Sequence, residues 1–144
     1  MTQKVVPLVL HPGGAPMRVL AFDHPITGAQ IVKGTIEPGE HPTRAAAREL
    51  FEESGLQAIS ALELAVRDDI WPGERWHFVL TRVRGPLGER FQHFCADDGG
   101  HLFKFWWHEL SKAGPFEPPF DQVLDAVRAA LSGSAGRSRA DSCP

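Results

Sequence analysis

The segment from Gly34 to Leu56, GTIEPGEHPTRAAARELFEESGL, constrains this chain more than any other part of its sequence. Pro42 suits the first turn of a helix, and Gly55 suits the position just past a helix end, so the segment predicts a helix over Pro42–Ser54. The three consecutive alanines in it favour helix and leave room for close packing. The helical geometry determines how the charged residues within this segment are placed relative to one another.

Three glutamates share one face of the predicted helix. At roughly 100° per residue, Glu49, Glu52 and Glu53 fall within an arc of roughly 100°. Apolar residues occupy the opposite side, which we expect to pack on a sheet: Ala47, Leu50 and Phe51. Carboxylates this dense repel one another unless a cation lies among them. Hard divalent cations prefer such oxygen ligands, so the helix predicts a site for Mg²⁺, with Mn²⁺ as the alternative.

A solvated helix face is the other interpretation of the same charges. Arg48 and Glu52 would then form an ordinary i, i+4 ion pair. That interpretation leaves the isolated Glu40 and the upstream turns at Gly34 and Gly39 unexplained. We therefore favour the metal site.

The charged residues and glycines also match a known signature. The matching positions are Gly34, Glu40, Arg48, Glu49, Leu50, Glu52, Glu53, Gly55 and Leu56. This pattern resembles the Nudix box without any departure, and a chance match at a given start is below about 10⁻⁷. The resemblance, extended over about residues 3–131, implies an α/β fold: a Nudix-type α/β/α sandwich with a central mixed sheet.

The resemblance implies a metal-dependent pyrophosphohydrolase. Such an enzyme cleaves the diphosphate linkage of a nucleoside diphosphate linked to another moiety, by attack of water at phosphorus. Its substrate would be a small nucleotide-type molecule: a nucleoside triphosphate, a dinucleoside polyphosphate or a nucleotide sugar. A non-catalytic, nucleotide-sensing domain of the same fold is the alternative, and the intact acidic positions favour the enzyme.

The same resemblance assigns roles within the box. Glu52 and Glu53 are the first choices as direct metal ligands, and Glu49 is a ligand or the base that takes the proton of water. Arg48 is expected to orient the glutamates. The predicted catalytic residues are therefore Arg48, Glu49, Glu52 and Glu53.

Residues outside the helix are expected to complete the metal site. Glu40 and the backbone carbonyl of Lys33 or Gly34 would contribute from the preceding loop. A later loop supplies a further acidic residue in many relatives, and Asp97 and Asp98 are the candidates here, expected among the substrate-binding residues, each with a solvated turn as the alternative. A weaker candidate for that acidic residue is Glu89.

Two residues are candidates for contacts with substrate outside the acidic positions. Trp71 stands beside Pro72-Gly73 in a predicted loop and can stack on a nucleobase, which is worth roughly 1–3 kcal/mol. Lys33 precedes the box and can contact a phosphate, with a surface lysine as the alternative. The remaining aromatic residues are expected mostly in the core: Trp76, Phe103, Trp106 and Trp107.

Composition and charge set the outer bounds. A chain of 144 residues that is 42% hydrophobic predicts one domain, over residues 1–131, and the Ser/Gly/Arg-rich segment 132–144 is expected to be disordered. The net charge of −3 without a basic run argues against binding duplex nucleic acid. No apolar stretch is long enough for a membrane, and no signal peptide is visible, so a cytoplasmic protein is expected. The sequence leaves the oligomeric state open.

Periodicity and turn residues predict the remaining elements. Strands are expected at 5–10, 18–22, 30–33, 62–68, 76–83 and 101–108, and a second helix at 121–131. Pro7 argues that the first strand lies at a sheet edge or is irregular. Residues 85–100 are expected to be irregular.

Overall fold

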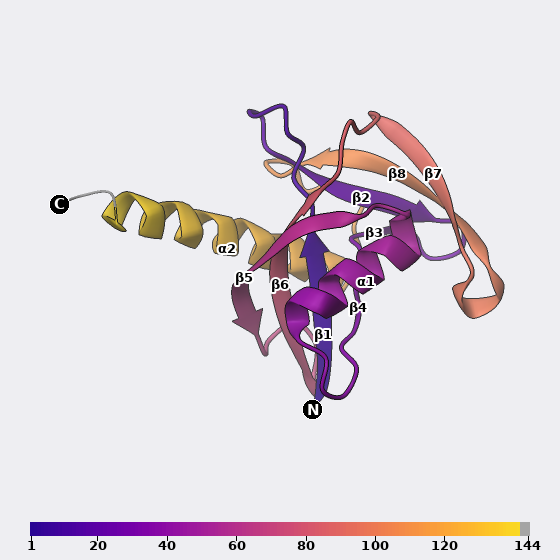
Figure 1. Ribbon diagram of the computed structural model, residues 1–144, viewed down its shortest axis with the longest axis horizontal. Helices are drawn as coiled ribbons and strands as arrows, with labels where there is room; N and C mark the ends of the chain where they lie inside the picture. Colours follow the sequence, from indigo (N-terminus) through magenta and orange to yellow (C-terminus); the bar gives the residue numbers. More distant parts are fainter. Residues whose placement is uncertain (142–144) are drawn as a thin grey trace.

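The structure, a computed structural model, describes residues 1–141, and for Asp98 and 134–141 it describes only the backbone. Within that part of the chain, eight strands form two four-stranded sheets (Figure 1). The first sheet, in the order β4-β1-β6-β5, is mixed, because β1 runs parallel to β6 while its other pairs are antiparallel. Its strands are β1 Thr2–Leu8, β4 Gly34–Thr35, β5 Ala58–Arg67 and β6 Glu74–Val83.

The second sheet is antiparallel, in the order β3-β2-β8-β7. Its strands are β2 Arg18–His24, β3 Gly28–Gln30, β7 Arg90–Cys95 and β8 His101–Glu109. The expectation that 85–100 is irregular is therefore wrong in its middle part. Glycine and proline mark only the ends of that segment, whereas the alternating residues between them pair with β8 from Arg90↔Trp106 to Cys95↔His101.

Strand β1 lies inside its sheet, so the edge position inferred from Pro7 is also wrong. The short β4 pairs only with Lys4 and Val5 of β1. Pro7 lies beyond the end of β4 and keeps its register with Val79 of β6. A proline is tolerated there because no neighbour on the β4 side needs its missing N–H.

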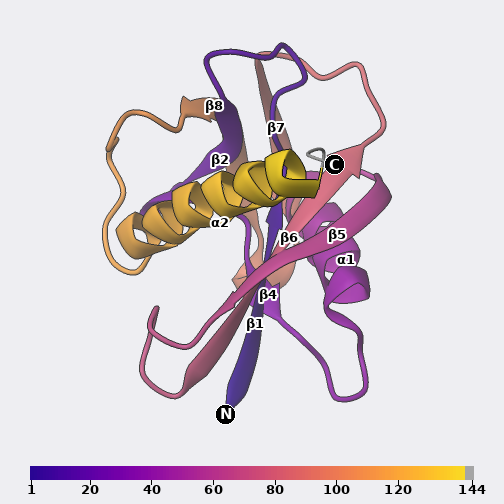
Figure 2. The same cartoon turned by 90° about the vertical axis from the view of Figure 1, so that its left-hand side faces the viewer.

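Two helices, α1 Pro42–Ser54 and α2 Phe120–Asp141, cover opposite faces of the first sheet (Figure 2). Successive side chains of β1 point to opposite faces. Val5 accordingly packs with the alanines of α1, whereas Val6 packs in the cluster that holds Leu124 of α2. The expected α/β/α arrangement around a mixed sheet is confirmed, and α1 additionally packs against the second sheet.

Helix α2 is longer than the sequence predicts. Its backbone continues past Leu131 to Asp141, into the segment expected to be disordered, and no proline interrupts it before Pro144. The last residues of that segment, 142–144, lie outside the described part of the chain. No helix of the described residues has the length and apolar character needed to cross a membrane.

Candidate catalytic and metal-binding site

Helix α1 begins and ends where its sequence predicts. The side chain of His41 accepts a hydrogen bond from the backbone N–H of Thr43 and caps the first turn, with Pro42 as the first helical residue. Gly55 ends the helix in the left-handed conformation, at φ 76°, and its N–H donates to the carbonyl of Phe51. A side chain at this position would be strained, so the glycine fixes the end of the acidic helix.

The buried arc of α1 is wider than the sequence predicts. Its fully buried residues are Ala45, Ala46, Leu50 and Ser54. Glu49 lies on the same side with a side chain only 12% exposed, and Glu53 is partly buried there as well. Phe51, expected to pack on the sheet, is 59% exposed, and Ala47 is only partly buried. The expectation that the carboxylates face away from the packed side is wrong for Glu49 and Glu53, because both sheets wrap around α1.

Glu53 has the least favourable surroundings for a negative charge. Burial, and next the nearby carboxylate of Glu49, raise the pKa of Glu53 from 4.5 to about 8. The backbone N–H of Lys33 donates to Glu53 Oε2 at 3.3 Å, and the charge of Lys33 opposes the shift. A buried carboxylate beside a second carboxylate is the arrangement that a bound cation would stabilise.

Gly34 makes room for Glu49. A Cβ atom at position 34 would lie 1.9 Å from Cδ of Glu49, closer than two such atoms can approach. Burial raises the pKa of Glu49, while its hydrogen bond from Arg48 acts in the opposite direction. The first glycine of the box is therefore required by the position of one of its glutamates.

Arg48 holds the remaining acidic residues together. Its Nε and Nη2 each donate to Glu40 at 2.8 Å, and its Nη1 donates to Glu49 at 2.8 Å and to Glu52 at 3.4 Å. Nη2 also donates to the carbonyl of Thr35 at 3.0 Å. The hydrogen bonds from Arg48 lower the pKa of Glu40 to about 2. This geometry suits the orienting role expected for Arg48.

Of the two later-loop acidic candidates whose side chains the structure describes, Asp97 lies near the glutamates of α1 and Glu89 pairs elsewhere. Asp97 begins the short 3₁₀ turn η1 Asp97–Gly99, and its charge raises the pKa of both Glu49 and Glu53. Glu89 instead accepts a hydrogen bond from Arg18 at 2.9 Å, away from these glutamates. The side chain of Asp98 lies outside the described part of the structure.

Trp71 and Lys33 line one small pocket of about 170 Å³. Trp71 is 49% exposed, as expected, and the Nζ of Lys33 lies 5.9 Å from the centre of the Phe120 ring. The other aromatic candidates are buried or partly buried, as expected of core residues: Trp76, Phe103, Trp106 and Trp107. The pocket has further lining residues that sequence reasoning missed: Lys4, Glu74 and Pro119. These residues are far apart in the sequence and come together only in the folded protein, so no sequence pattern indicates that they share a pocket.

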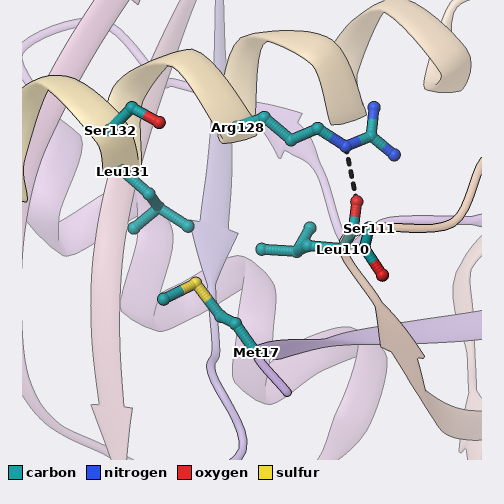
Figure 3. Close-up of a pocket in the computed structure, with 6 residues that line it drawn as sticks. All are labelled: Met17, Leu110, Ser111, Arg128, Leu131 and Ser132. Atoms are coloured by element: carbon teal, nitrogen blue, oxygen red, sulfur yellow. Dashed lines mark hydrogen bonds between the residues drawn. The ribbon is translucent and has the colours of Figure 1, made fainter. Parts of the chain in front are cut away.

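A second pocket, of about 420 Å³, lies under the far part of α2 (Figure 3). Its lining residues are Met17, Leu110, Ser111, Arg128, Leu131 and Ser132. Arg128, the one charged residue among them, donates through Nε to the carbonyl of Leu110. This pocket contains no acidic side chain, so it does not belong to the candidate catalytic site.

The donor set of α1 suits a hard divalent cation. Magnesium keeps several waters and needs only a few carboxylates together with substrate phosphates. Glu53 and Glu49 provide buried carboxylate oxygens, and Glu52 lies at the exposed edge of the same face. Among the described residues no group of three or more acidic, histidine or cysteine side chains is already arranged to hold a metal ion.

Stability of the metal-free protein should depend on Glu53. Its pKa is 4.5 in an ordinary setting and about 8 in the fold, so between these pH values the folded protein holds a proton that the unfolded chain has lost. The free energy of unfolding should therefore decrease as the pH rises through this window. Urea unfolding in EDTA across the window measures the slope, which Glu53→Gln should flatten. Equal slopes in the two proteins would contradict the burial of a protonated Glu53.

Comparisons with known proteins agree with the geometry. A family model described as NUDIX domain matches residues 2–128. An RNA pyrophosphohydrolase of Brucella anthropi is 32% identical over 119 residues, which cover 71% of this chain and 68% of the relative. The RNA pyrophosphohydrolase of Brucella abortus is 30% identical over 111 residues, which cover 66% of this chain and 62% of the relative. The chain thus spans about two thirds of the length of these relatives.

Solved structures show the same fold. MutT from Aliivibrio salmonicida and Vibrio cholerae superposes with a TM-score of 0.63 at 19% identity, covering 89% of this chain and 97% of the other. An ADP-ribose pyrophosphatase from Streptococcus suis superposes with a TM-score of 0.67 at 15% identity, covering 92% of this chain and 91% of the other. At such identities the likeness concerns the fold alone.

Proposed function

The chain belongs to the Nudix hydrolases, and we propose that it is a metal-dependent pyrophosphohydrolase. It would cleave the diphosphate linkage of a nucleoside diphosphate linked to another moiety, by attack of water at phosphorus. The observation that carries this proposal is Glu53, a buried carboxylate placed against a second carboxylate, Glu49, within a complete box. A fold does not keep the carboxylate of Glu53 there for stability, because a buried charge without an ion-pair partner costs free energy.

We propose the following residues as the ligands of the metal. Glu53 and Glu52 remain the first choices, with the backbone carbonyl of Gly34 or Lys33 as a further ligand. Both oxygens of Glu40 already accept hydrogen bonds from Arg48, so Glu40 is better suited to fixing Arg48 than to binding metal. When bound, the metal would neutralise phosphate oxygens and lower the pKa of a coordinated water.

Glu49 is placed to handle the proton of the attacking water. Its Oε1 accepts a hydrogen bond from Arg48 at 2.8 Å, which would leave Oε2 as the oxygen that takes the proton. Burial raises the pKa of Glu49, and a base with a raised pKa accepts a proton more readily near neutral pH. Arg48 would then hold Glu49 in place while the proton is transferred.

The nucleoside would lie outside the box, in the pocket lined by Trp71 and Lys33. Lys33 connects the two regions, because its N–H contacts Glu53 and its side chain lines the pocket. Stacking on Trp71 would hold a base, and the ammonium of Lys33 would offset phosphate charge. Candidate substrates are nucleoside triphosphates, dinucleoside polyphosphates and nucleotide sugars. The relatives from Brucella, which are RNA pyrophosphohydrolases, add RNA to these candidates.

A substrate panel tests this function. With Mg²⁺, we expect at least one of these classes to release a phosphate or diphosphate product, and EDTA to abolish the release because the metal supplies several kcal/mol of transition-state stabilisation. Product identity, read by chromatography, shows which bond breaks. Binding without turnover across the whole panel would instead favour the nucleotide-sensing alternative and overturn the proposal.

A further inference from the structure

The pocket beside Lys33 contains one carboxylate, that of Glu74. Glu74 Oε1 accepts a hydrogen bond from the indole N–H of the buried Trp76 at 3.1 Å. Among the described residues Glu74 forms no ion pair, and its Oε2 has no hydrogen-bond partner. An ionised carboxylate only accepts hydrogen bonds, so the pocket presents a fixed acceptor to whatever enters it.

A tight turn fixes Glu74 relative to Trp71. The backbone N–H of Glu74 donates to the carbonyl of Trp71 at 3.2 Å, and Gly73 adopts φ 78° between them. The N–H of Thr2 donates to the carbonyl of Gly73 at 3.1 Å and ties this turn to the start of β1. The exposed indole and the carboxylate are therefore held close together in the lining of the pocket.

The pocket also contains two lysines, one of which contacts the catalytic residue Glu53 through its backbone. Lys33 and Lys4 both line it, and Lys4 Nζ is held by Thr35 Oγ1 at 2.9 Å. Lys33 reaches Glu53 through its backbone, as described above. A ligand with its phosphates near Glu53 would thus pass the lysines and place its base near Trp71 and Glu74.

The carboxylate of Glu74, as a hydrogen-bond acceptor, would distinguish among the four nucleobases. Guanine alone of the four common bases presents two adjacent donors on one edge, N1–H and the N2 amino group, and these match the two oxygens of a carboxylate. Adenine and cytosine place an unprotonated ring nitrogen beside their amino group, and uracil flanks its single N–H with carbonyl oxygens. Each of those edges would direct a lone pair toward Glu74.

We propose that Glu74 determines base specificity, accepting hydrogen bonds from the edge of a guanine base that stacks on Trp71. This inference rests on the proposed function and narrows its substrate class to guanine nucleotides. The two lysines offset the charge of the phosphates, so the carboxylate does not repel the nucleotide as a whole. Glu74 acts on recognition of the base and takes no part in cleavage.

Turnover of matched substrates gives the first test. We expect kcat/KM for GTP to exceed that for ATP by about 10-fold or more, the range for a good bidentate contact, with ITP in between because it lacks the N2 amino group. Glu74→Gln replaces one acceptor with a donor, which matches N6 and N1 of adenine, so the preference should invert toward ATP. The measured quantity is the ratio of kcat/KM for GTP to that for ATP in the same protein. A general loss of activity lowers both values and leaves this ratio unchanged. Diguanosine and diadenosine tetraphosphate extend the comparison to linked nucleotides.

Equilibrium binding gives a test that does not need turnover. GDP should quench the fluorescence of Trp71 at about 10-fold lower concentration than ADP in the wild-type protein, and Trp71→Phe should identify the signal. The control Glu63→Gln removes a carboxylate on β5 that contacts His77 and should leave the GDP preference unchanged. Equal affinity for GDP and ADP, or a preference that survives Glu74→Gln, overturns the inference. Hydrolysis without base preference would leave the proposed function standing, whereas guanine-selective binding without hydrolysis would refute only that function.

Discussion

Glu53→Gln is expected to lower kcat by about a thousand-fold, a larger effect than the one expected for Gly34→Ala. Three powers of ten correspond to about 4 kcal/mol of transition-state stabilisation, which is the size of contribution made by a bound metal. The amide keeps the size of the carboxylate but cannot provide a negative ligand. Measured with the substrate found in the panel, KM should change far less than kcat.

The fold should tolerate this substitution. With a pKa of about 8, Glu53 is largely protonated at neutral pH in the metal-free protein, and a neutral amide resembles the protonated acid. The metal-free variant should therefore unfold at a urea concentration equal to or above that of the wild type at pH 8. Calorimetric titration should show weaker binding of Mg²⁺ or Mn²⁺. Turnover equal to that of the wild type would remove Glu53 from the catalytic site.

The helix of the box was predictable because its signals are local. The proline near its first turn and the glycine after its end lie within the segment, and the observed bounds Pro42–Ser54 agree with the prediction. The pairing of Arg48 with Glu52 likewise follows from helical spacing, because the two residues are four positions apart. Its further bonds to Glu40 were less visible, because they depend on the path of the loop before the helix.

The burial of individual side chains was not predictable from that spacing. Helical periodicity assumes one packed side, so it placed Phe51 inward and Glu49 outward. Two sheets surround α1, which buries Glu49 and leaves Phe51 at the surface. The pocket of Trp71 and Lys33 depends on tertiary structure in the same way, because β1 and β6 bring Glu74 beside residues distant in the sequence. Local patterns predict the acidic helix but not its environment.

Gly34→Ala is expected to lower kcat by about 100-fold while the fold remains intact. The added Cβ would lie 1.9 Å from Cδ and 2.3 Å from Oε1 of Glu49, so that side chain must move. It is flexible and can move without displacing the backbone of β4, and a misplacement of about 1 Å in a catalytic group can cost about 100-fold. Circular dichroism and the melting temperature should therefore change little.

A double-mutant cycle establishes whether Gly34 acts through Glu49. If it does, Gly34→Ala should lower kcat strongly in the wild type and have almost no further effect in the Glu49→Ala background, because the displaced group is already absent. Gly133→Ala is the matched control, since a Cβ there meets no atom within 4 Å. Its kcat should equal that of the wild type. Additive losses from Gly34→Ala and Glu49→Ala would show that Gly34 has a separate role, such as its own backbone carbonyl at the metal.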